Sequence, residues 1–110
     1  MSWATMAIVR LQQGHTVIVR PRGHSMLPLI RSGTAVTVEP LGTAVPQVDD
    51  IVLCRVHGRD YLHRVVAVGP RGYLIGNARG RINGWVPRRA IYGRAVRNSL
   101  RRNDQHEDYR

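Results

Sequence analysis

The chain has 110 residues, a formal net charge of +10 and no lysine, so all 17 basic side chains are arginine. This length excludes two full-sized domains, and Val, Ile and Leu have to build the core because only 5% of the residues are aromatic. The single cysteine, Cys54, excludes an intramolecular disulfide, and its apolar neighbours predict a small core residue. No apolar run approaches the roughly 20 residues of a membrane span, and residues 1–11 lack the pattern of a signal peptide. We therefore expect a cytoplasmic protein.

Glycine and proline divide the chain into short segments, most of which have the residue pattern of β-strands. Before them, residues 6–13 predict a short helix or an arm, in an N-terminal region of residues 1–14. Runs rich in branched side chains then predict six strands, at residues 16–20, 35–39, 50–55, 61–68, 72–75 and 91–96. We expect residues 15–97 to form one mainly β domain, a small coiled antiparallel sheet or partial barrel. The charged residues 98–110 are expected to form a flexible tail.

The segment from Gly23 to Ile30 is the most informative one. Ser25 follows a glycine by two positions and precedes Pro28, which predicts one short helical turn that begins at Ser25. A serine at such a turn exposes its hydroxyl, and the backbone N–H groups of the turn suit a developing oxyanion. Taken alone, however, a serine in this position is more often a plain helix N-cap.

Four further motifs favour the catalytic interpretation. After Gly-x-Ser-Met-x-Pro at residues 23–28 come Ser32–Val36, Asp49–Val52, Leu62–Val66 and Ile91–Val96, in this order. The series resembles the catalytic domain that type I signal peptidases share with LexA-like self-cleaving repressors, and the resemblance covers residues 17–96. It implies the coiled, mainly β fold of that family, cleavage of a peptide bond, and neither metal nor cofactor.

The resemblance implies that Ser25 is the nucleophile and His63 the general base. Bacterial signal peptidases and LexA-like proteins carry a lysine at the position of His63, whereas archaeal, endoplasmic-reticulum and sporulation-type signal peptidases carry a histidine. Because this chain has no lysine, a Ser–His dyad is the version of the mechanism that remains. Without the resemblance, a half-buried strand histidine bonded to a backbone carbonyl is the better explanation of His63.

The residues next to Ser25 are candidates for the surroundings of the dyad. Met26 and His24, next to Ser25, are candidates for lining the cleft and for binding the oxyanion. Two positions depart from the family pattern, with Thr34 in place of an aspartate and Asp49 in place of a glycine. Both look like turn variations that leave the dyad intact.

A third departure concerns the group that orients the imidazole. Relatives with a histidine base usually carry an aspartate for this purpose, but here the corresponding segment has Asn77 and Asn83. An asparagine holds a ring tautomer but stabilises an imidazolium less well than a carboxylate does. Asp60 is a third candidate, although its position three residues before His63 places it on the opposite face of a strand.

The basic composition allows a second interpretation of the chain. Arg79, Arg81, Arg88 and Arg89 flank Trp85, an arrangement that suits a nucleic-acid strand, although we favour a solvated hairpin. We predict a serine endopeptidase that processes a dedicated protein or peptide substrate. The alternative is a catalytically weak or inactive relative that binds a protein or a nucleic acid.

Overall fold

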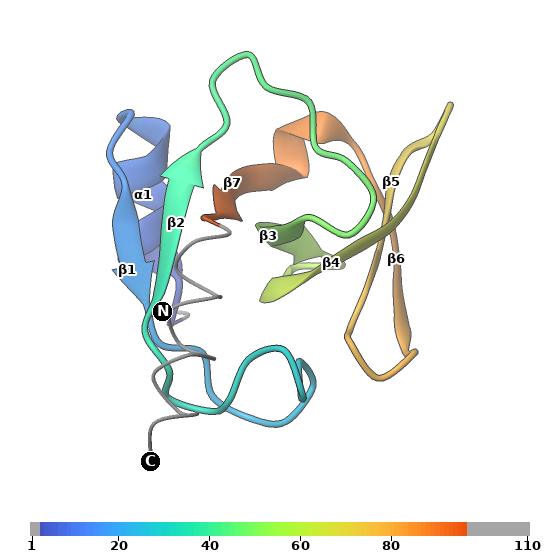
Figure 1. Cartoon of the computed structure of the whole chain (residues 1–110). Helices are drawn as coiled ribbons and strands as arrows, with labels where there is room; N and C mark the ends of the chain where they lie inside the picture. Colours follow the sequence, from blue (N-terminus) through green and yellow to red (C-terminus); the bar gives the residue numbers. More distant parts are fainter. Residues whose placement is uncertain (1–2, 97–110) are drawn as a thin grey trace.

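The structure, a computed structural model, describes residues 3–96. Within that range a single α-helix is followed by seven strands, and a short 3₁₀ helix precedes the last strand (Figure 1). The elements are α1 (Thr5–Gln12), β1 (Val17–Val19), β2 (Val36–Pro40), β3 (Ile51–Val56), β4 (Arg59–Gly69), β5 (Gly72–Gly76), β6 (Ile82–Val86), η1 (Arg88–Ala90) and β7 (Ile91–Ala95). The predicted mainly β fold is confirmed, whereas the tail predicted at residues 98–110 lies outside the described residues.

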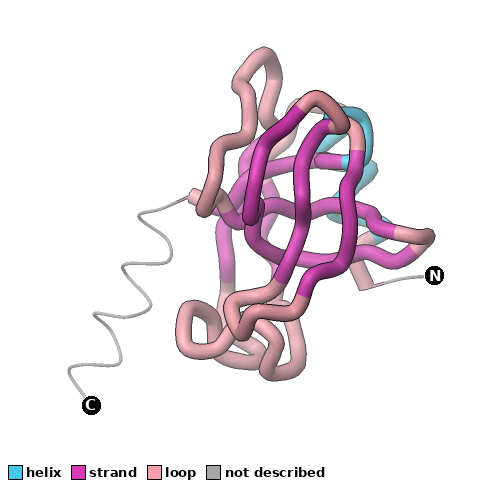
Figure 2. Tube along the Cα trace, turned by 90° about the vertical axis from the view of Figure 1, so that its right-hand side faces the viewer, coloured by secondary structure: helices cyan, strands magenta, loops and turns pink. Residues whose placement is uncertain are grey.

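All seven strands belong to one open antiparallel sheet with the order β1-β2-β7-β3-β4-β5-β6. Strands β3 to β6 follow one another as a meander, and β7 returns to lie between β2 and β3. In Figure 2 some strands run steeply across the direction of others, so the sheet is curved. Bulges between Val65 and Ala67 and between Ile75 and Gly76 interrupt the pairing. Because a bulge bends its strand and increases the local twist, these irregularities account for part of this curvature.

Branched aliphatic side chains fill the core, as the composition predicts. Strand β3 is buried on both faces, because Ile51 and Leu53 belong to one buried cluster and Val52 and Cys54 belong to another. The first cluster also contains side chains of α1, which lies beside β1 and β2 (Figure 1). An uninterrupted apolar run is what a strand covered on both sides requires. No helix within residues 3–96 is long and apolar enough to cross a membrane.

The sequence patterns missed one strand, and the turn that they predicted after Ser25 does not extend into a helix. The seventh strand, β6, was not predicted, because Asn83 and Gly84 are poor strand formers; its pairing with β5 overrides that preference. The segment after Ser25 is a turn and not part of a helix: Leu27 N–H donates to the carbonyl of His24, three residues earlier, and Ile30 N–H donates to that of Met26, four residues earlier, as in a single helical turn. Pro28 has no N–H with which to continue a helical hydrogen-bond series.

Candidate active site

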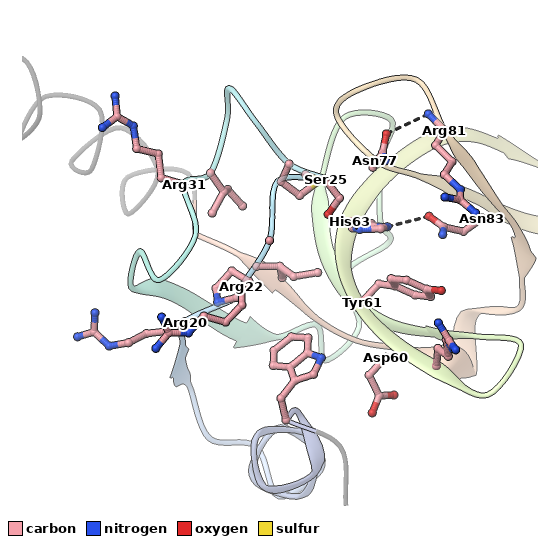
Figure 3. Close-up of a pocket in the computed structure, with 17 residues that line it drawn as sticks. Arg20, Arg22, Ser25, Arg31, Asp60, Tyr61, His63, Asn77, Arg81 and Asn83 are labelled. Atoms are coloured by element: carbon pink, nitrogen blue, oxygen red, sulfur yellow. Dashed lines mark hydrogen bonds between the residues drawn. The ribbon is translucent and has the colours of Figure 1, made fainter.

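Ser25 and His63 are far apart in the sequence, but their side chains meet in the structure (Figure 3). Oγ of Ser25 lies 3.0 Å from Nε2 of His63, which is hydrogen-bond distance. His63 stands near the middle of β4, and Ser25 stands in the loop between β1 and β2. Gly23, with a φ of 103°, turns this loop towards Ser25 and donates its N–H to Oγ of Ser32 at 3.0 Å. A nucleophile and its base require this kind of contact.

The second ring nitrogen of His63 is held by Asn83 of β6. Nδ1 of His63 lies 2.7 Å from Oδ1 of Asn83. An amide oxygen only accepts hydrogen bonds, so Nδ1 carries the proton and donates it to Asn83. In the neutral ring Nε2 is then unprotonated and accepts the hydroxyl proton of Ser25. The tautomer is therefore the one that a general base needs.

The surroundings of His63 favour its neutral form. Its side chain is buried at 6% exposure, and its ring centroid lies 4.6 Å from that of Tyr61, two residues earlier on the same strand. Burial lowers the pKa of His63 below its ordinary value of 6.5, and the hydrogen bond with Asn83 opposes part of that change. The imidazole is consequently unprotonated, and able to accept a proton, at neutral pH.

The segment that joins β5 to β6 positions Ser25, and the strand after it contacts His63. The buried Asn77 follows β5, and its Oδ1 accepts the backbone N–H groups of Arg79 and Arg81 at 2.8 and 2.9 Å. The next residue, Ala78, donates its N–H to the carbonyl oxygen of Ser25 at 3.1 Å. One connection therefore holds the Ser25 backbone, while the strand that follows it supplies the partner of His63.

Of the three candidates for orienting His63, the structure brings only Asn83 into hydrogen-bond contact with the ring. The oxygen of Asn77 is engaged in the turn after β5. The carboxylate of Asp60 lies 2.8 Å from Nε of Arg55, its cross-strand neighbour. Asp60 also lines the cleft, but its carboxylate is bound to Arg55 and not to the ring of His63.

The residues beside Ser25 take different positions. Met26 is buried and lines the cleft, whereas His24 is exposed and is not among the lining residues. Within residues 3–96 the backbone N–H groups of Ser25 and Met26 have no hydrogen-bond acceptor. Two such donors next to the Ser25 hydroxyl have the arrangement that suits the oxyanion of an acyl-transfer reaction.

Ser25 and His63 open onto a cleft of about 470 Å³, a volume typical of ligand sites. Met26, Ile30 and Leu62 are the buried apolar side chains that line it. Its remaining lining is mostly polar or basic, and it includes residues that the sequence did not single out: Trp3, Arg20, Arg22, Arg31, Arg59 and Tyr61. Proximity in the chain was the available signal, because three of these arginines lie within six residues of Ser25 and Tyr61 precedes His63 by two.

The five residues predicted as a nucleic-acid surface differ in their relation to the cleft. Arg81 lines the cleft, whereas Arg79 and Arg89 are exposed outside it. Arg88 donates from Nη1 to the carbonyl oxygen of Ile91 at 3.0 Å and so serves the fold. Trp85 is 42% exposed on β6 and its ring lies beside Gly69. Arg81 is thus the one of the five that lines the cleft of Ser25.

Comparisons with protein-family models, with curated proteins and with solved structures found no match for this chain. Within residues 3–96, no three His, Cys, Asp or Glu side chains are grouped so as to hold a metal ion. Function is therefore inferred from the geometry and the chemistry of the site.

Proposed function

We propose that this chain is a serine endopeptidase in which Ser25 attacks a peptide carbonyl and His63 is the general base. One observation carries the proposal, namely the hydrogen-bonded series from Ser25 Oγ through both ring nitrogens of His63 to Asn83 Oδ1, with separations of 3.0 and 2.7 Å. Nucleophile, base and orienting group have the same order in serine proteases of unrelated folds. The open cleft beside them leaves room for a peptide.

The mechanism follows from the positions of the protons. Ser25 Oγ attacks the carbonyl carbon while its proton moves to Nε2 of His63, and the resulting oxyanion accepts hydrogen bonds from the N–H groups of Ser25 and Met26. The imidazolium then gives this proton to the leaving amine, and the C–N bond breaks. Water attacks the acyl-enzyme with His63 again as base, which releases the acid and restores the hydroxyl. Nδ1–H of His63 remains bonded to Asn83 throughout.

We further propose that the fold is the one shared by signal peptidases and LexA-like proteases. The order of the five motifs supports this proposal, and so does the mainly β, antiparallel architecture. Asp49 adds a local argument, because it stands where that family usually has a glycine and its φ is 75°. Glycine adopts this left-handed conformation most readily, and aspartate is among the few other residues that tolerate it.

The experiment that tests the activity needs no known substrate. Purified protein is incubated with a proteome-derived peptide mixture, and new termini are identified by mass spectrometry. We expect Ser25→Ala and His63→Gln each to lower the cleavage rate by at least about 10³-fold, whereas His15→Gln, at an exposed position, leaves it unchanged. Cleavage at the same sites by the Ser25→Ala protein would contradict the proposal.

A second variant tests the dyad without any cleavage. In Ser25→Cys, the new thiol lies next to the imidazole, which stabilises the thiolate as it does in cysteine proteases. We expect iodoacetamide to modify this variant rapidly at neutral pH and the double variant Ser25→Cys/His63→Gln about 10-fold or more slowly. Equal rates for the two proteins would mean that His63 does not activate position 25.

The second candidate function is a non-catalytic binding module built on the same fold. Asn83 favours it, because an amide in place of a carboxylate gives less stabilisation to an imidazolium. This function would be supported if the protein cleaves no peptide and binds a partner with the same affinity as the Ser25→Ala variant does. A steep loss of that binding with salt would identify the partner as a nucleic acid.

A further inference from the structure

The walls of the cleft carry an excess of positive charge. Among the residues 3–96 that line it, Asp60 is the single acidic one, and its carboxylate is already paired with Arg55, at 2.8 Å from its Nε. Against it stand five lining arginines: Arg20, Arg22, Arg31, Arg59 and Arg81. A cleft lined by one sign of charge concentrates its field and attracts ligands of the opposite sign.

Several arginines outside the cleft have structural contacts. Arg64 lies 2.8 Å from a carboxylate oxygen of Asp49, and Arg94 lies 3.4 Å from one of Asp50. Arg88 donates hydrogen bonds to two backbone carbonyls. For these side chains, the contacts within the fold explain why an arginine is present.

Three of the cleft arginines, Arg22, Arg59 and Arg81, have no comparable contact with the described residues. Within residues 3–96, the guanidinium groups of Arg22, Arg59 and Arg81 form neither an ion pair nor a hydrogen bond. Arg20 makes one long hydrogen bond, at 3.3 Å, to the carbonyl oxygen of Gly33. All four side chains are exposed, so their charges are available to a molecule that enters the cleft.

These arginines stand on both sides of the dyad. Arg20 and Arg22 lie on the chain segment that leads to Ser25, while Arg81 lies beside Asn83 on the opposite wall (Figure 3). Arg59 is the first residue of β4, the strand that contains His63. A chain segment that passes Ser25 therefore meets guanidinium groups before and after the point of attack.

We propose that the cleft selects peptide segments with aspartate or glutamate side chains on both sides of the bond that is cleaved. This inference rests on the endopeptidase function proposed above and names its substrate class. Guanidinium groups bind carboxylates through paired, charge-assisted hydrogen bonds. The buried apolar lining of Met26, Ile30 and Leu62 accepts a small apolar side chain between the acidic ones. A peptide with acidic side chains on either side of an apolar one fits this lining better than a nucleic acid, which carries a negative charge at every nucleotide.

The test uses one peptide that the protein cleaves and a matched peptide in which every Asp and Glu is replaced by Asn or Gln. We expect the acidic peptide to have a kcat/KM at least about 10-fold higher, with the advantage shrinking as salt is added. The variants Arg59→Gln and Arg81→Gln should each reduce this advantage, and neither removes a hydrogen bond or an ion pair within residues 3–96. Arg71→Gln removes an equally exposed arginine outside the cleft and should leave the ratio unchanged.

A charge reversal separates recognition from general loss of activity. Arg81→Glu should disfavour the acidic peptide and favour a version with arginine at one flanking position. Equal kcat/KM values for the acidic and the amide peptides would overturn this inference while leaving the endopeptidase intact. If no peptide is cleaved in a Ser25-dependent way, the proposed function itself fails. Loss of oligonucleotide binding in Arg59→Gln and Arg81→Gln, with unchanged peptide preference, would also overturn the inference.

Discussion

Oδ1 of Asn83 lies 2.7 Å from Nδ1 of His63, so an amide stands where serine proteases usually place a carboxylate against the imidazole. The amide fixes the tautomer of His63 but does not compensate the charge of an imidazolium. Burial lowers the pKa of His63, and the hydrogen bond with Asn83 opposes only part of that change. The site therefore contains a neutral imidazole whose orientation is fixed by Asn83.

The first prediction concerns Asn83→Asp. The carboxylate should raise the pKa of His63 and stabilise the imidazolium of the transition state. We expect kcat to increase by about 10-fold at neutral pH and the acidic limb of the pH–rate profile to move to higher pH. Asn83→Leu, which cannot accept the Nδ1 proton, should lower kcat by about 10²-fold. An unchanged pH profile in Asn83→Asp would contradict the role of residue 83 as the orienting group.

The second prediction links His63 to stability. Its pKa in the folded protein is below the value of 6.5 expected in the unfolded chain, so the unfolded state binds the proton more tightly. The free energy of unfolding should therefore fall as the pH drops through 6.5 towards the folded-state pKa, by at most about 1.4 kcal/mol per pH unit for this group. Urea denaturation between pH 8 and pH 5 measures this slope. His63→Gln should show a smaller slope, and equal slopes would contradict the prediction.

The third prediction concerns Cys54. Its thiol is buried, and burial together with the charge of Asp60 raises its pKa from 9.0 to about 12. At neutral pH the thiolate population is then about 10³-fold lower than for an ordinary cysteine. We expect no reaction with iodoacetamide in the native protein and full reaction in 8 M urea. Rapid labelling of the native protein would mean that Cys54 is accessible and would also compromise the Ser25→Cys test.

The fourth prediction concerns Asn77, which organises the turn after β5. Asn77→Ala removes the acceptor of two backbone N–H groups and should lower the free energy of unfolding by about 1–3 kcal/mol. Because Ala78 holds the carbonyl of Ser25, the cleavage rate should fall as well. Asn77→Asp keeps an oxygen acceptor and should restore most of both losses. Equal stability of Asn77→Ala and the wild type, measured by urea denaturation, would show that this turn forms without the side chain.

The sequence by itself determined the mainly β class, the positions of six of the seven strands described by the structure, and two features of the candidate site. Alternation of apolar and polar residues and the spacing of Gly and Pro are local signals, so they survive without tertiary information. The absence of lysine excluded a Ser–Lys dyad, and the motif around Ser25 made that serine the candidate nucleophile. What local patterns did not contain was the pairing of strands, and β6, with its asparagine and glycine, was missed for that reason.

Only the tertiary structure decided which of Asn77, Asn83 and Asp60 meets His63. That outcome depends on the pairing of β5 with β6 and on the register shift between Ile75 and Gly76, since moving a strand by one residue turns each side chain to the other face. The gathering of arginines from the Ser25 loop, β4 and the β5–β6 connection into one cleft is likewise a product of long-range packing. Residues that are far apart in the chain come into contact only when strand pairing and loop packing place them side by side.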